Sequence, residues 1–90
     1  MPSIQARVAA SLTAVQLAPL RAERRAIGIY NATETGVLTL KLGGAPDLTL
    51  GSETFTARVL PGGRWKEETG DPVYGIWDRA DGYAQVEEYL

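Results

Sequence analysis

Apolar and polar residues alternate along most of this chain, in short runs separated by Gly, Pro, Asn and Asp. In the clearest run Leu38, Leu40 and Leu42 point to one face, whereas Thr39 points to the other. Alternation of this kind is typical of a β-strand that is buried on one side. Composition that suits a helix is confined to residues 18–26, so the pattern predicts a chain built from strands.

We expect strands over residues 3–9, 12–18, 25–31, 36–42, 54–60, 73–78 and 83–89, with a further short piece over 62–68. Short strands at fairly even spacing, with turn residues between them, predict a small antiparallel β-sandwich of about seven or eight strands. Both a jelly-roll-like and an immunoglobulin-like sandwich fit this pattern. We interpret residues 1–90 as a single domain, in which residues 1–12 form strands or an extended N-terminal arm.

Several short segments are interpreted as turns. The glycine pairs at 43–44 and 62–63 lack the surrounding residues of a phosphate-binding loop, and we expect them where a hairpin needs a positive φ. Asp78 and Asp81 are spaced wrongly for an EF-hand calcium loop, so we expect a polar hairpin turn there. Residues 18–26 are expected to form a connection with at most one helical turn.

Composition excludes several function classes. The chain has no Cys and no His, so it lacks a thiolate nucleophile, the commonest general base and the commonest metal ligand. The acidic residues Glu67, Glu68 and Asp71 are close neighbours, which indicates a solvated loop and not a catalytic pair across a cleft. Nine basic and eleven acidic residues give a net charge of −2, which argues against nucleic-acid binding. We therefore expect no enzyme, no cofactor, no metal and no membrane span.

Arg21, Arg24 and Arg25 are the only basic cluster of this acidic chain. We predict that they contact another subunit. Ordinary surface arginines in an exposed connection are the alternative, and a contact with phosphate is a weaker one, because no aromatic residues are interleaved.

Six Trp and Tyr residues are many for ninety positions. Trp77 lies within an expected strand and is assigned to the core or to an interface, whereas Trp65 lies between Arg64 and Lys66 and is predicted to make an exposed aromatic contact. Sugar binding by Trp65 and nearby tyrosines is a further alternative.

Four stretches, in this order, resemble a group of small proteins encoded by tailed phages and prophages: RRAIGIYN, GVLTLKLGG, SETFTARVLPGGRWKEE and VYGIWDRADGYAQVEEY. The matching positions are Arg24-Arg25, Ile29-Tyr30-Asn31, Leu42-Gly43, Leu60-Pro61-Gly62-Gly63, Trp65, Glu67 or Glu68, Gly75-Ile76-Trp77, Ala80, Gly82, Ala84, Val86 and Glu88. The resemblance covers about Leu17 to the C-terminus and departs from the usual pattern at Asp71-Pro72.

The resemblance implies a β-rich structural protein of a virion, made in the cytoplasm of the host bacterium. We expect a capsid decoration or cement protein that binds the major capsid protein or other virion proteins. A homo-oligomer, with a trimer favoured, suits this role because weak contacts add up when several are made together. The alternatives are a module of the tail, neck or head fibre, and a carbohydrate-binding module for a host receptor.

Overall fold

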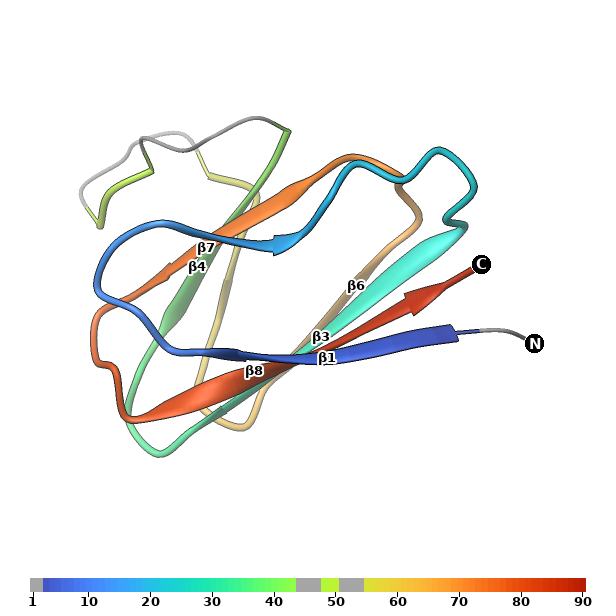
Figure 1. Cartoon of the computed structure of the whole chain (residues 1–90). Coiled ribbons are helices and arrows are strands. Elements are labelled where there is room, and N and C mark those ends of the chain that lie inside the picture. Colours follow the sequence, from blue (N-terminus) through green and yellow to red (C-terminus); the bar gives the residue numbers. More distant parts are fainter. Residues whose placement is uncertain (1–2, 44–47, 51–54) are drawn as a thin grey trace.

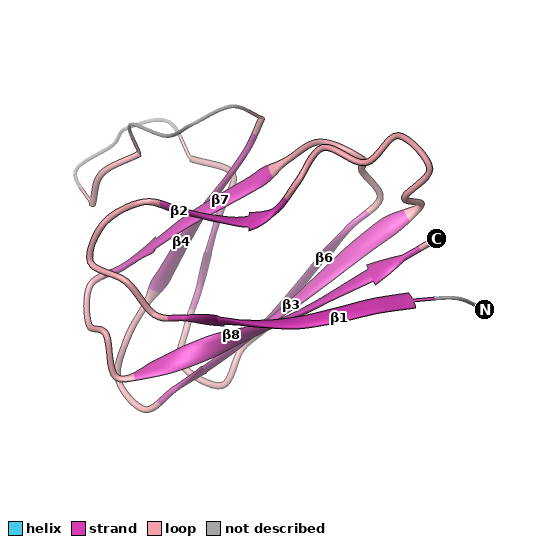
Figure 2. Ribbon diagram, viewed as in Figure 1, coloured by secondary structure: helices cyan, strands magenta, loops and turns pink. Residues whose placement is uncertain are grey.

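The computed structural model describes residues 3–43, 48–50 and 55–90, and the strands in this part of the chain form two packed four-stranded sheets. The predicted all-β sandwich is confirmed (Figure 1, Figure 2). The strands are β1 (Ser3–Ala9), β2 (Val15–Ala18), β3 (Ala26–Thr33), β4 (Leu38–Leu42), β5 (Ala57–Val59), β6 (Arg64–Glu67), β7 (Val73–Trp77) and β8 (Gly82–Tyr89). No helix long and apolar enough to cross a membrane occurs in the described ranges.

The first sheet has the order β1-β8-β3-β6 and the second sheet the order β2-β7-β4-β5, with every neighbouring pair antiparallel. The chain changes sheet at each connection except the one between β4 and β5. This order is the double Greek key of a jelly roll, which decides between the two kinds of sandwich that the sequence allowed. Because β1 pairs with β8, the start of β1 and the end of β8 lie side by side at the same end of the molecule (Figure 1).

The core lies between the sheets and follows the predicted alternation. Ile27 and Ile29 of β3 face Leu38 and Leu40 of β4 and Trp77 of β7 in one cluster, and each of the five is at most 2% exposed. Burial of side chains of this size contributes about 1.5–3 kcal/mol each, so this cluster is the main stabilising element of the sandwich.

The structure corrects several details. β2 begins at Val15 and not at residue 12, because the Thr13 backbone N–H donates to Ser11 Oγ at 3.1 Å and turns the chain there. The connection over residues 18–26 has a β-turn, in which the Arg24 N–H donates to the Arg21 carbonyl at 3.0 Å, and no helical turn. The strand predicted over residues 3–9 is confirmed as β1, and its pairing with β8 along its whole length sets aside the alternative of an extended arm for these residues.

The turn glycines are partly as predicted. Gly43 and Gly62 have φ values of +87° and +76°, which confirms the expected positive φ at these two positions. Gly62 and the Asp78–Asp81 segment do not close hairpins, however, because β5 and β6, like β7 and β8, belong to different sheets. Gly44 and residue 54, the first of the strand expected over 54–60, lie outside the described residues.

Asn31 is a fully buried polar residue at the centre of the sandwich. Its Nδ2 donates to the carbonyls of Gly36 and Val59, both at 2.8 Å. Its Oδ1 accepts from Trp77 Nε1 at 3.1 Å and from Thr33 Oγ1 at 3.0 Å. One side chain therefore links β3 to β5 and β7 of the opposite sheet and satisfies the indole of the largest core residue.

The backbone of Asn31 adds a second link. Its N–H donates to the Gly63 carbonyl at 3.0 Å, and its carbonyl accepts from the Gly62 N–H at 2.8 Å. The Pro61-Gly62-Gly63 turn is thus held directly against β3.

We predict that Asn31→Ala lowers the free energy of unfolding by about 2 kcal/mol or more. The substitution removes the Asn31 partners of the buried Val59 carbonyl and of the Trp77 indole N–H, and each such group costs about 1–3 kcal/mol, whereas the Gly36 carbonyl still accepts from Thr33 Oγ1 at 2.7 Å. Urea denaturation measures the loss, with the exposed Glu34→Ala as a control that changes stability by less than about 0.5 kcal/mol. Equal stability of the two variants would contradict the assignment.

Candidate functional site

The outer face of the first sheet carries three tyrosines, Tyr30 on β3 and Tyr83 and Tyr89 on β8. They point outward because Ile29 and Val86, at neighbouring positions of the same strands, are buried in the core. A cation lies over each ring: Arg64 over Tyr30 at 5.1 Å, Arg7 over Tyr83 at 4.7 Å and Lys66 over Tyr89 at 4.7 Å from the ring centroid. We call this surface the tyrosine face.

Hydrogen bonds between neighbouring strands hold the polar side chains of the tyrosine face. The Tyr89 hydroxyl donates to Glu87 Oε1 at 2.8 Å, and Gln5 Nε2 donates to Glu87 Oε2 at 3.2 Å. Arg7 Nε donates to Gln85 Oε1 at 3.3 Å. The bond to the Glu87 carboxylate raises the pKa of the Tyr89 hydroxyl above its ordinary value.

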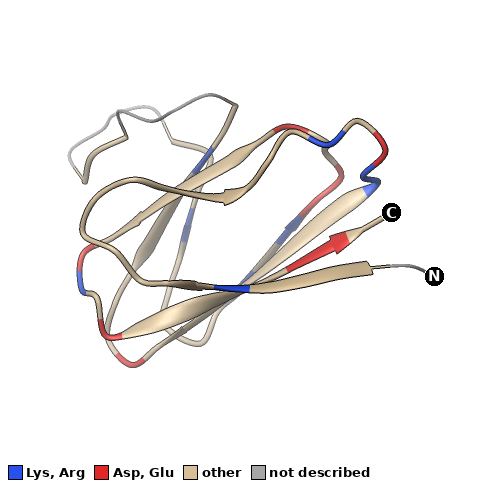
Figure 3. Ribbon diagram, viewed as in Figure 1, with Lys and Arg blue, Asp and Glu red and all other residues tan. Residues whose placement is uncertain are grey.

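A hollow of about 240 Å³ lies on this face over Gly28 of β3. Gly28 pairs with Lys66 of β6 on one side and with Glu87 of β8 on the other, so basic and acidic groups flank it (Figure 3). The residues around the hollow are Gly28, Ile29, Tyr30, Arg64, Trp65, Lys66, Gln85, Glu87 and Tyr89.

Trp65, the predicted exposed aromatic contact, is only partly exposed. It pairs with Ile29 and packs against the core, although it also borders the hollow. The outward aromatic groups of this sheet are the tyrosines instead. Because side chains alternate along β6, Trp65 lies on one face of the sheet and Arg64 and Lys66 lie on the other. Only the pairing with β3 determines which of these faces is turned toward the core.

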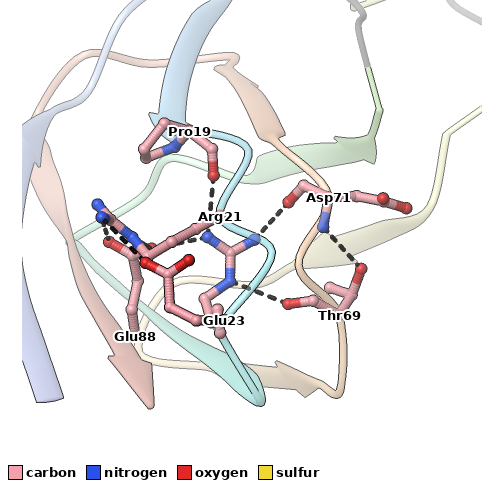
Figure 4. Close-up of polar contacts among 7 residues, drawn as sticks. Pro19, Arg21, Glu23, Thr69, Asp71 and Glu88 are labelled. Carbon is pink, nitrogen blue, oxygen red and sulfur yellow. Dashed lines mark hydrogen bonds and ion pairs between the residues drawn. The ribbon is translucent and has the colours of Figure 1, made fainter. Parts of the chain in front are cut away.

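The three arginines of the basic cluster have different environments. The Arg24 side chain has no exposed area in this chain, and its guanidinium donates to Glu88 Oε1 at 2.7 Å. Further Arg24 N–H groups donate to the carbonyls of Pro19 at 3.0 Å, Thr69 at 2.9 Å and Asp71. Figure 4 labels these three partners together with Glu88. Arg24 therefore ties together two connections and β8.

Arg21 lies over the same carboxylate, with its Nε donating to Glu88 Oε1 at 2.9 Å. Burial favours the protonated form of Glu88, but the hydrogen bonds and charges of Arg21 and Arg24 outweigh it, so the pKa of Glu88 is lowered. Arg25 is exposed. Arg24 is thus not available for a contact at the surface of this chain. The subunit contact stays a prediction for Arg25 and for Arg21, whose side chain is 28% exposed.

Asp78 and Asp81 brace the connection between β3 and β4. Asp78 Oδ1 accepts from the Val37 N–H at 2.7 Å, and Asp81 Oδ2 accepts from the Thr35 hydroxyl at 2.6 Å. The bonds from Thr35 lower the pKa of Asp81. In the described residues no three His, Cys, Asp or Glu side chains are grouped so that they could hold a metal ion.

β1 is an edge strand with a regular free side. The Ala10 N–H donates to the Gly82 carbonyl at 2.9 Å. Ala10 and every second residue before it therefore point their backbone N–H and C=O groups toward β8. Backbone groups of the alternate residues point away from β8, at an edge where no described strand pairs. These residues are Ser3, Gln5, Arg7 and Ala9.

Comparisons of the chain with protein-family models, curated proteins and solved structures give no match.

We predict that Glu88→Ala lowers the free energy of unfolding by about 3–5 kcal/mol, because it leaves the buried Arg24 guanidinium without its counter-charge. Urea denaturation is the measurement. Glu68→Ala, an exposed glutamate, is the control and changes stability little. A loss below about 1 kcal/mol for Glu88→Ala would show that the buried pair does not stabilise the fold.

The lowered pKa of Glu88 also predicts a pH dependence. The stabilisation is fully present above the pKa of an unfolded glutamate, about 4.3, and is lost as the pH falls through the lower value of the folded chain. Glu88→Gln removes this titration, so its unfolding free energy should fall less between pH 6 and pH 3 than that of the unmodified chain or of Glu68→Gln. Parallel pH profiles of all three would contradict this.

Proposed function

We propose that this chain is a structural protein of a tailed-phage virion, which binds the capsid surface as a decoration or cement protein. The observation that carries the proposal is the free, regular edge of β1, which offers a strand to a neighbouring protein. The sequence resemblance to small phage proteins supports the same conclusion. A jelly roll is compatible with it, since viral capsid domains use this architecture, but a fold alone does not imply a function.

Several of the residues that carry the resemblance lie in the two buried networks, although others, such as Arg25 and Leu60, are exposed. Arg24 pairs with Glu88, and Asn31 binds Trp77 and the turn at Gly62. These residues stabilise the fold and are not surface contacts. The resemblance therefore supports a shared scaffold, and the surface that contacts a partner has to be found by other criteria.

The four edge strands differ in how well they suit pairing with another chain. β2, β5 and β6 have only four, three and four residues, and the pairing of β2 shifts register between Gln16 and Ala18. Short and irregular edges of this kind discourage pairing. β1 has seven residues in uninterrupted register, with Arg7 as its only charged residue and no proline. It is the edge best suited to add a strand of a capsid protein.

Proteomic quantification of purified particles tests the function. A decoration protein should be present in a simple ratio to the major capsid protein, in hundreds of copies. A small number of copies would place the chain in the neck, tail or fibre, and absence from the particle would overturn the virion assignment.

Re-addition of purified protein to particles that lack it tests the role of β1. Gln5→Pro removes one outward N–H and blocks close approach of a partner strand, and we expect at least about a tenfold loss of affinity. Gln5→Ala keeps the backbone N–H and is the matched control, with near-normal binding and the same thermal stability.

Equal binding of both Gln5 variants would show that β1 is not the contact. Self-association of the free protein that Gln5→Pro abolishes would assign the edge to a second copy and would also contradict a capsid contact there.

A further inference from the structure

Gly28 is a glycine that neither the backbone nor the packing requires. It lies in β3, which is paired on both sides, and its φ is not positive. A Cβ at this position would meet only the Tyr89 side chain, at 3.8 Å, which is an ordinary contact. Alanine would fit, and a glycine inside a regular element costs roughly 0.5–1 kcal/mol relative to alanine.

At other positions of the sandwich glycine is required because a Cβ atom would clash with its neighbours. A Cβ at Gly75 would lie 2.8 Å from a Leu17 methyl group and 2.9 Å from a Leu38 methyl group, and a Cβ at Gly82 would lie 2.2 Å from the Ala32 carbonyl. At Gly28 the absent side chain has a different effect, since it leaves the hollow of the tyrosine face open. Glycine within a strand often marks a close approach of a ligand.

The groups around the hollow suit a sugar ring. A pyranose has apolar C–H faces and a rim of hydroxyl groups, so it needs aromatic surface together with hydrogen-bonding side chains. Tyr30 and Tyr89 supply the aromatic surface, with one face of each ring covered by Arg64 or Lys66, and Gln85 and Glu87 of β8 supply the polar groups. The volume of about 240 Å³ lies below the roughly 300–1,000 Å³ of drug-sized sites, which suits one ring and not an extended ligand.

The charges around the hollow favour an acidic sugar. Arg64 and Lys66 come from β6, on one side of Gly28. Glu87, on the other side, is the one acidic residue among those around the hollow, and its carboxylate is held by hydrogen bonds from Tyr89 and Gln5. The β6 side is thus cationic, and a ligand carboxylate there gains charge-assisted hydrogen bonds.

We propose that the hollow over Gly28 binds one uronic-acid residue of a polysaccharide. The ring lies over Gly28 between Tyr30 and Tyr89, and the carboxylate contacts Arg64 and Lys66. This inference does not rest on the proposed virion function, because it uses the tyrosine face and not the β1 edge.

An array that carries oligosaccharides of hyaluronan, alginate and polygalacturonate, beside neutral dextran and maltose oligosaccharides, tests the proposal. The unmodified protein should bind uronic-acid glycans and not the neutral ones. The best of them is then titrated by intrinsic fluorescence, and its affinity should fall as the salt concentration rises. Binding to no uronic-acid glycan, or equal binding to neutral ones, would overturn the proposal.

Variants test whether Gly28 leaves room for a bound sugar or only for the Tyr89 side chain that packs beside it. Gly28→Val places a branched side chain in the hollow and should weaken binding at least tenfold without loss of stability, and Lys66→Gln should weaken it severalfold. Ala32→Val adds the same branched side chain on the same face of β3, outside the hollow, and should bind normally. Unchanged affinity of Gly28→Val would assign the glycine to packing and overturn the site.

Discussion

A buried guanidinium sets the arrangement of one end of this sandwich. Arg24 reaches the Glu88 carboxylate of β8 and the carbonyls of Pro19, Thr69 and Asp71, so connections far apart in sequence meet at one side chain. A buried charge is tolerated only when its hydrogen-bonding capacity is filled. The positions of the β2–β3 and β6–β7 connections are therefore not independent of each other.

Asn31 likewise joins distant segments inside the sandwich, but through neutral groups. Its side-chain amide forms hydrogen bonds with backbone carbonyls of β5 and of the β3–β4 connection, and with the indole N–H of Trp77. No buried side-chain polar atom of the described residues lacks a partner. Apolar burial holds the sheets together, while these two networks fix how the connections cross between them, which apolar contact alone specifies less well.

The strands could be predicted because alternation reports burial directly. The expected segments over 3–9, 36–42 and 83–89 match β1, β4 and β8 closely. The sequence predicts exposure for Arg24 and Trp65 because charge and charged neighbours are typical of surface positions. The burial of Arg24 and the partial burial of Trp65 depend on Glu88 and Ile29, which are distant in sequence, so no local pattern reveals them. The tyrosine face was missed for the same reason, since it forms only when three strands are set side by side.

The pairing of the first strand with the last also constrains the order in which the molecule can be completed during synthesis. Of the eight described strands β1 is made first, yet its only partner in the described chain is β8, which is made after the other seven. Until then β1 has two open edges and Glu88, the counter-charge of Arg24, is still missing. The chain is therefore open to unwanted strand pairing until β8 has been made, and a chain truncated within β8 cannot close the sandwich.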